Sequence, residues 1–322
     1  MRFPITAFLL GLSLLPGTAP QAQAQDSYPS KSVRLVVPLP GGGPSDFLAR
    51  LVAQHLTRSL GQPVVVDNKP GGDGAIAARD VMSAPADGHT LLFAPGSMLA
   101  GPLQAKPPAF DWLSEFAPIG KVGRLSFCLI VHPDLPVKTV AEFVAYARAN
   151  PDKLNYSTAT LGELMAASQF MKATGTRMVR VPYKGGMQAM PDLMAGRIQA
   201  MFGPVTLAQP HVRSGAVRVL ATLLPQRSAA MPDVPTLAEA GVTGVSVPTW
   251  QSVFAPAKTA RPIVERLASE LAAVMAKPEV RAELERRAML PEIETPQALA
   301  MTVTQDQSDW TRLIAEYKLG AE

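Results

Sequence analysis

Short apolar runs alternate with amphipathic stretches along most of the chain. The apolar runs predict buried strands, and several are apolar throughout, as in a parallel sheet that helices cover on both faces. Strands alternating with helices predict an α/β fold. The predicted strands span residues 33–37, 64–67, 90–94, 126–131, 178–181, 198–202 and 217–223.

Helices are predicted where apolar residues recur every three to four positions. The stretch "DFLARLVAQHLTRSL" carries this repeat, with Ser45 as its predicted N-cap and Gly61 as its end. "TVAE" at 139–142 and "TLAE" at 236–239 each match a capping box. The chain from residue 261 onward is predicted to be almost wholly helical, over 262–277, 278–289 and 296–318.

The first 24 residues have the pattern of a cleavable signal peptide rather than of a folded element. Arg2 supplies the positive start, an apolar core follows, and "AQA" ends the segment at Ala24. The apolar core is short for a membrane span, and no later run reaches the roughly 18 apolar residues that one needs. The prediction is a soluble, exported chain in the periplasm; the alternative is an uncleaved membrane anchor.

Charge and cysteine content narrow the possible partners. The formal net charge of +4, without a Lys/Arg cluster, argues against nucleic acid and slightly favours acidic small ligands. Cys128 is the single cysteine, so it forms no internal disulfide, and its apolar neighbours indicate a core position. No cysteine follows the signal segment directly, so no lipid anchor is predicted.

The loop between the first strand and the first helix has the composition of an anion-binding site. Gly41, Gly42 and Gly43 let the backbone approach a ligand, and the helix that follows offers unpaired N–H groups and a partial positive charge. Asp46 suits the helix dipole but competes with an anion placed too close. A nucleotide-binding P-loop needs Lys-Ser/Thr after its glycines, whereas "PSD" follows them here. The loop is therefore not predicted to be a nucleotide-binding P-loop. A tight turn without a ligand remains the structural alternative.

Four more segments carry polar or aromatic groups beside strand ends. Each group also has an alternative role without a ligand. For the hydroxyl groups it is helix capping, for the lysine it is exposure to solvent, and for the tryptophan it is packing in the core. The candidates are Gly96 and Ser97; Ser157, Thr158 and Thr160; Lys184; and Trp250.

No catalytic or metal-binding pattern emerges. The four histidines, His55, His89, His132 and His211, have no partner at metal-ligand spacing. "APGSMLAG" lacks the G-x-S-x-G turn of a serine nucleophile. The sequence therefore predicts no catalytic residue, no metal and no cofactor.

Several motifs in fixed order resemble one family of receptors. "YPSKSVRLVVPLPGGGPSDFLAR", "LGQPVVVDNKPGGDGAIAA", "DGHTLLF", "VPYKGG" and "MPDVPTLAEAG" are similar to segments of the Bug-type solute receptors of tripartite tricarboxylate transporters. The similarity continues through "FAPAKTARPIVERL", so it spans nearly the whole chain after the signal segment.

This resemblance implies a type II-like periplasmic binding protein with two α/β lobes, each built on a mostly parallel sheet, and a ligand cleft between them. The expected lobes are residues 25–124 with 228–322, and residues 125–227, with the chain crossing twice. Such receptors bind organic acids mainly through backbone groups, hydroxyls and water, and deliver them to membrane permease subunits. A monomer is expected. The resemblance adds Leu39, Pro40 and Gly203 to the candidate ligand-binding residues.

The chain departs from the family pattern at ligand-facing positions. Leu39 replaces a usual aromatic residue, Glu163 and Leu164 interrupt the usual Gly/Thr…Ser-His segment, and Gly203 replaces a usual Asp or Asn. The loss of polar groups favours a larger or more apolar acid, for example an aromatic carboxylate. A receptor that presents its ligand to a signalling partner is the alternative function, and an exported enzyme is a distant third.

Overall fold

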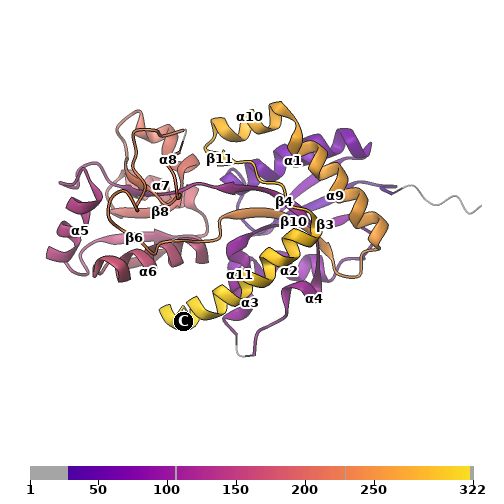
Figure 1. Cartoon of the computed structure of the whole chain (residues 1–322), viewed down its shortest axis with the longest axis horizontal. Helices are drawn as coiled ribbons and strands as arrows, with labels where there is room; N and C mark the ends of the chain where they lie inside the picture. The colour runs from indigo at the N-terminus through magenta and orange to yellow at the C-terminus, as the bar shows by residue number, and fades with distance from the viewer. Residues whose placement is uncertain (1–27, 106, 229, 320–322) are drawn as a thin grey trace, which may run out of the picture.

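The computed structural model of the chain describes residues 28–105, 107–228 and 230–319, and its strands form two sheets, each within its own lobe (Figure 1). The predicted signal segment, residues 1–24, lies outside the described residues. The first sheet has the order β11-β4-β10-β3-β1-β2. In it, β10 and β11 run against the other four strands. These strands are β1 (Val33–Val37), β2 (Val64–Asn68), β3 (Thr90–Pro95), β4 (Phe116–Leu125), β10 (Trp250–Pro256) and β11 (Met289–Leu290).

The second sheet has the order β7-β6-β8-β5-β9, and only β5 runs against its neighbours. The chain passes from β4 to β5 across the single residue Ser126, and it returns from β9 to β10 through residues 223–249. The sheets are therefore mostly parallel, and each has an antiparallel strand where the chain has just crossed between them. The strands are β5 (Phe127–Val131), β6 (Asn155–Thr158), β7 (Val179–Pro182), β8 (Ala200–Pro204) and β9 (Arg218–Thr222).

Helices cover both faces of each sheet. On β1, Leu35 packs toward α1 and α9, whereas Val36 packs toward α2 and α11. The second sheet is covered by α5 and α6 on one face and by α7 and α8 on the other. The predicted two-lobed α/β fold is confirmed, whereas the exact lobe limits stay a prediction. The main helices are α1 (Pro44–Leu60), α2 (Ala75–Met82), α5 (Val140–Ala149), α6 (Leu161–Thr174), α7 (Gly186–Met194), α8 (Val205–Val212), α9 (Arg261–Ala276), α10 (Pro278–Arg286) and α11 (Pro296–Tyr317).

Shorter helical turns connect these elements. They include η1 (Gly72–Gly74) and η2 (Gly96–Leu99), which lie near the cleft described below, and α3 (Ala100–Leu103) and α4 (Trp112–Glu115). The long α11 extends from the first lobe toward α6 of the second lobe (Figure 1). There Lys172 of α6 forms an ion pair with Glu316 of α11 at 2.5 Å. This ion pair joins the two lobes.

The local predictions were wrong at three places. Ser45 does not cap α1, because Pro44 occupies the first helical turn and Gly43 is the N-cap; the Ser45 hydroxyl instead donates to Gln251 Oε1 at 2.9 Å. The "TLAE" segment makes both capping-box hydrogen bonds between Thr236 and Glu239, yet a turn follows instead of a helix. The predicted helix 278–289 ends at Arg286, after which β11 pairs with β4. The "TVAE" capping box is confirmed at α5.

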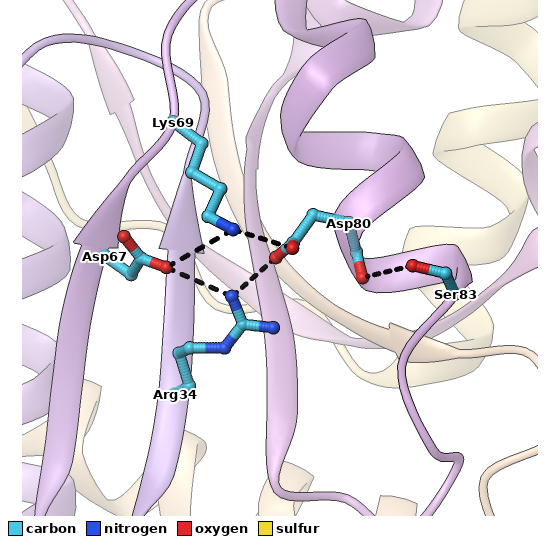
Figure 2. Close-up of polar contacts among 5 residues, drawn as sticks. All are labelled: Arg34, Asp67, Lys69, Asp80 and Ser83. Atoms are coloured by element: carbon cyan, nitrogen blue, oxygen red, sulfur yellow. Dashed lines mark hydrogen bonds and ion pairs between the residues drawn. The ribbon is translucent and has the colours of Figure 1, made fainter.

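A cluster of four charged residues ties α2 to the first sheet (Figure 2). Arg34 of β1 contacts Asp67 of β2 at 3.0 Å and Asp80 of α2 at 2.5 Å, and Lys69 contacts Asp80 at 2.6 Å. Two cations thus balance two carboxylates. Burial opposes the charge of Asp80, but hydrogen bonds from Lys69 and Arg34 outweigh it and lower the pKa of Asp80.

Candidate functional site

Two adjoining cavities open between the lobes, and together they form the cleft. The inner chamber, of about 150 Å³, lies beside the segments that connect the two sheets. The outer chamber, of about 270 Å³, lies next to it. Both are lined by Leu39, Pro95, Ser97, Ala159 and Thr160.

The inner chamber lies at the N-termini of four helices. Its lining includes Pro44 of α1, Gly162 of α6, Gly186 of α7 and Leu207 of α8. The first turn of a helix has N–H groups without intrahelical partners and a partial positive charge. Four helix starts around one cavity make it electrostatically favourable for an anion, although no basic side chain is among its described lining residues.

At α1, part of the predicted anion site is already occupied by the protein itself. The Gly42 N–H donates to Asp46 Oδ2 at 2.9 Å, and Arg50 and Asn68 also bond to this carboxylate. Burial opposes the charge of Asp46, but the hydrogen bonds from Arg50, Gly42 and Asn68 outweigh it and lower its pKa. Gly42, with φ +84°, therefore supplies the turn but not a free amide.

At α6, a second acid lies at the same helical position. Thr160 is the N-cap and accepts from the Glu163 N–H at 3.2 Å, while Glu163 Oε2 accepts from the Ala159 N–H at 2.6 Å. Glu163 is 3% exposed and lines the inner chamber. Burial raises the pKa of Glu163 to about 8, although the two backbone hydrogen bonds oppose this rise.

The outer chamber has basic side chains. Arg180 and Lys184 line it, together with Asp73. The Arg180 Nε donates to Thr158 Oγ1 at 2.9 Å, and neither cation forms an ion pair within the part of the chain that the structure describes. The family resemblance gave no reason to expect an arginine here, and the position of Arg180 on the wall is a feature that sequence reasoning missed.

Nine of the predicted ligand-binding residues lie on the cleft. Ser45 and the loop before it face the inner chamber, Thr158 and Lys184 face the outer one, and Ser97 and Thr160 face both. The nine are Leu39, Pro40, Gly41, Gly43, Ser45, Ser97, Thr158, Thr160 and Lys184.

Six predicted residues line neither chamber: Gly42, Asp46, Gly96, Ser157, Gly203 and Trp250. Gly42 and Asp46 bond to each other. Trp250 is 2% exposed, its Nε1 donates to Asp306 at 2.6 Å, and its ring covers Gly96. Trp250 thus lies where the alternative prediction, a buried structural tryptophan, expects it, and not on the wall of the cleft.

The remaining two lie inside the second sheet. Ser157 is buried on β6, and Gly203 of β8 packs against the Met201 side chain.

The lining residues of the inner chamber that sequence reasoning did not propose as ligand-binding include Glu163, Phe127 and Gln251. "TLGE" at 160–163 matches the capping-box pattern, so the position of Glu163 at a helix start was readable. Phe127 and Gln251 lie next to the chain crossings, and only the folded arrangement brings them to the cavity.

The described residues contain no helix long and apolar enough to cross a membrane. Within the same residues, no group of three or more His, Cys, Asp or Glu side chains is placed to hold a metal ion.

Two α/β lobes, two chain crossings and an anion-favouring cleft between the lobes define a solute-binding protein. The family model described as "Tripartite tricarboxylate transporter family receptor" matches residues 48–319. The chain belongs to this family, as its motifs predicted.

Known proteins agree with this assignment. A "UPF0065 protein in tcbD-tcbE intergenic region" of Pseudomonas sp. strain P51 is 34% identical over 97% of this chain and 94% of its own length. The structure of R. palustris Rpa4515 with adipate is 32% identical, with a TM-score of 0.85 over 90% of this chain and 98% of that one. MatC (Rpa3494) from Rhodopseudomonas palustris, with bound malate, is 29% identical, with a TM-score of 0.83 over 89% of this chain and 100% of that one.

Proposed function

We propose that this protein is a periplasmic receptor that captures an organic acid by its carboxylate in the inner chamber and delivers it to the membrane subunits of a tripartite permease. In this proposal it acts as a monomer, without a cofactor and without catalysis. The predicted signal segment supports export to the periplasm. The receptor family supports a transport role, and two related structures carry adipate and malate.

The observation that carries the proposal is the meeting of four helix N-termini at the inner chamber, with Arg180 at the neighbouring outer chamber. Hydrogen bonds to a charged group contribute about 1.5–3 kcal/mol each. A few of them supply much of the roughly 8 kcal/mol that corresponds to micromolar binding, before the cost of immobilising the ligand.

The walls of the inner chamber favour an acid with an apolar body. Leu125, Phe127 and Leu207 are buried and line the cavity, and Met187 lines it as well. Such side chains gain from contact with hydrocarbon or an aromatic ring rather than with further hydroxyl groups. The aromatic carboxylate suggested by the sequence therefore remains part of the proposal.

Mass spectrometry of the acid retained by the purified protein tests the function without presupposing which acid is bound. Thermal unfolding with adipate, malate, benzoate and benzamide then tests the chemistry. We expect stabilisation by carboxylates and none by benzamide, the uncharged match to benzoate. Stabilisation by benzamide as strong as by benzoate would contradict capture through a carboxylate. Stabilisation by malate alone would contradict the apolar body.

A further inference from the structure

Glu163 is the one ionisable side chain among the described residues that line the inner chamber. Its Oε2 is fixed by the Ala159 N–H at 2.6 Å. The Thr160 N–H also faces the carboxyl group, and within the described residues no side chain donates to its other oxygen, Oε1. The side chain is 3% exposed, so bulk solvent provides little compensation for a charge on it.

The elements around Glu163 bring no cation to compensate a carboxylate. α1 contributes Ser45 to the chamber, and its charged Asp46 is bonded to Arg50 and Gly42. β5, α7, α8 and β10 contribute only uncharged side chains, among them Phe127, Gln188, Leu207 and Gln251. The nearest charged groups on the cleft wall are Arg180, Lys184 and Asp73, which line the outer chamber.

These surroundings favour the neutral form of the side chain. Burial raises the pKa of Glu163 to about 8, so at neutral pH the group is mostly protonated. Because the Ala159 N–H holds Oε2 as an acceptor, the proton resides on Oε1. The chamber is then lined by a carboxylic acid O–H, a strong hydrogen-bond donor.

We infer that Glu163 recognises the ligand as a neutral acid: its Oε1–H donates a hydrogen bond to the ligand carboxylate in the inner chamber. This inference rests on the proposed function and names the group that makes capture depend on pH. An ionised Glu163 would repel the same carboxylate. Binding above the pKa of Glu163 therefore requires uptake of one proton.

Isothermal titration of the full protein with adipate, malate and benzoate between pH 6 and pH 9 tests the inference. The three ligands stay ionised throughout this range. We expect each ligand that binds to have a constant Kd up to about pH 7 and a Kd about tenfold higher at pH 9, because proton uptake then opposes binding.

Two substitutions separate hydrogen-bond donation from charge. In Glu163→Gln, the amide keeps an acceptor for Ala159 and presents an N–H to the chamber, so we expect the pH dependence to disappear. Glu163→Ala removes the donor, and its Kd at pH 6 should rise about tenfold. Glu142→Gln is the matched control, since Glu142 holds the same position at the start of α5 on an exposed surface. It should keep the wild-type pH profile.

The outcomes separate this inference from the proposed function. A flat wild-type profile, or a Kd that rises tenfold in Glu163→Gln at pH 6, would overturn the inference while carboxylate capture stands. An affinity that increases with pH would overturn it as well, because the ligand would then bind better to the ionised form of Glu163 than to the neutral one. Failure of all three acids to bind at pH 6, together with no acid retained by the purified protein, would overturn both.

Discussion

The starts of α1 and α6 place the same kind of group in opposite electrostatic situations. Asp46 and Glu163 each lie at the third helical position, and each accepts a hydrogen bond from the N–H that precedes the N-cap. Asp46 also bonds to Arg50 and Asn68, and its pKa is lowered. Glu163 has no such side-chain partners within the described part of the chain, and burial raises its pKa to about 8. Helix position alone thus fixes the local hydrogen bond, whereas burial and the number of neighbouring donors decide the charge.

Arg50 and Arg180, the two arginines near the cleft, also differ in whether a carboxylate compensates their charge. Arg50 bonds to Asp46 at 2.9 Å, so its charge is compensated within α1. Among the residues that the structure describes, Arg180 bonds to the neutral hydroxyl of Thr158 and to no carboxylate. A free guanidinium on a cavity wall suits an acidic group of the ligand, whereas a paired one serves the fold.

Replacing Arg180 is expected to have the largest effect on binding. Arg180→Ala should raise the Kd for the acid retained by the purified protein about tenfold to a hundredfold, since a charge-assisted hydrogen bond is lost. Arg177→Ala is the control, because Arg177 pairs with Asp152 at 2.8 Å on the surface. Calorimetric titration distinguishes the two, and equal Kd values for Arg180→Ala and wild type would rule out a role of Arg180 in binding.

The second prediction compares the two ends of α1. Gly42 and Gly61 have φ values of +84° and +72°, and a Cβ at either would meet no atom within 4 Å. Gly42→Val and Gly61→Val should each cost about 1–2 kcal/mol of unfolding free energy through backbone strain. Only Gly42→Val should weaken ligand binding, by about tenfold, because it displaces the loop that forms the inner chamber.

Urea unfolding and calorimetric titration of both glycine variants measure these quantities. Equal loss of affinity in the two would show that general destabilisation, and not the loop before α1, controls binding.

The third prediction gives Asp46 and Glu163 opposite effects on stability. A lowered pKa stabilises the fold above the unfolded value, so Asp46→Asn should lower stability at pH 7, and the difference should shrink as the pH falls below 3.8. A raised pKa means that the folded state binds the proton more tightly, so wild-type stability falls between pH 4.5 and about 8. Glu163→Gln should therefore be more stable than wild type at pH 8 and lose this advantage near pH 4.5.

Thermal unfolding of both variants across this pH range gives the comparison. If the Glu163→Gln variant is less stable than wild type at pH 8, the Glu163 carboxylate of the wild type must have a stabilising partner beyond the contacts described above.

The smallest effect is expected at the charged cluster of Arg34, Asp67, Lys69 and Asp80 (Figure 2). Its carboxylates are paired like Asp46, but the side chains are a quarter to a third exposed, which weakens the attraction. Asp80→Asn should cost about 1 kcal/mol of unfolding free energy, and Glu265→Gln, in an exposed pair with Arg261, less than about 0.5 kcal/mol. Urea unfolding tests both, and equal losses would show that the cluster adds nothing beyond an exposed pair.

Much of the fold followed from local pattern. The strands at 33–37 and 64–67 and the start of α5 were predicted within a residue, because apolar runs and capping pairs are local signals. β4 was missed because Pro118, Gly120 and Gly123 interrupt it, and its stability comes from long pairing with β10. β6 was missed because "NYST" is polar, and only its place between β7 and β8 makes it a strand.

The candidate site was predictable only as a set of loops. Gly41, Gly43 and Thr160 line the inner chamber, and they stood out in the sequence because glycines after a strand and a capping residue before a helix have local signatures. Their role in ligand binding stays a prediction. The protonation of Glu163 and the free guanidinium of Arg180 depend on which side chains lie nearby after folding. The occupation of the Gly42 amide by Asp46 likewise depends on the turn geometry.

A crystal structure with the retained acid tests the central claim, capture of a carboxylate by helix N-termini in the inner chamber, most directly. We predict a ligand carboxylate within hydrogen-bond distance of backbone N–H groups at the starts of α1, α6 or α7, with one oxygen next to Glu163. A carboxylate bound outside this chamber, or a retained ligand without an acidic group, would contradict the account.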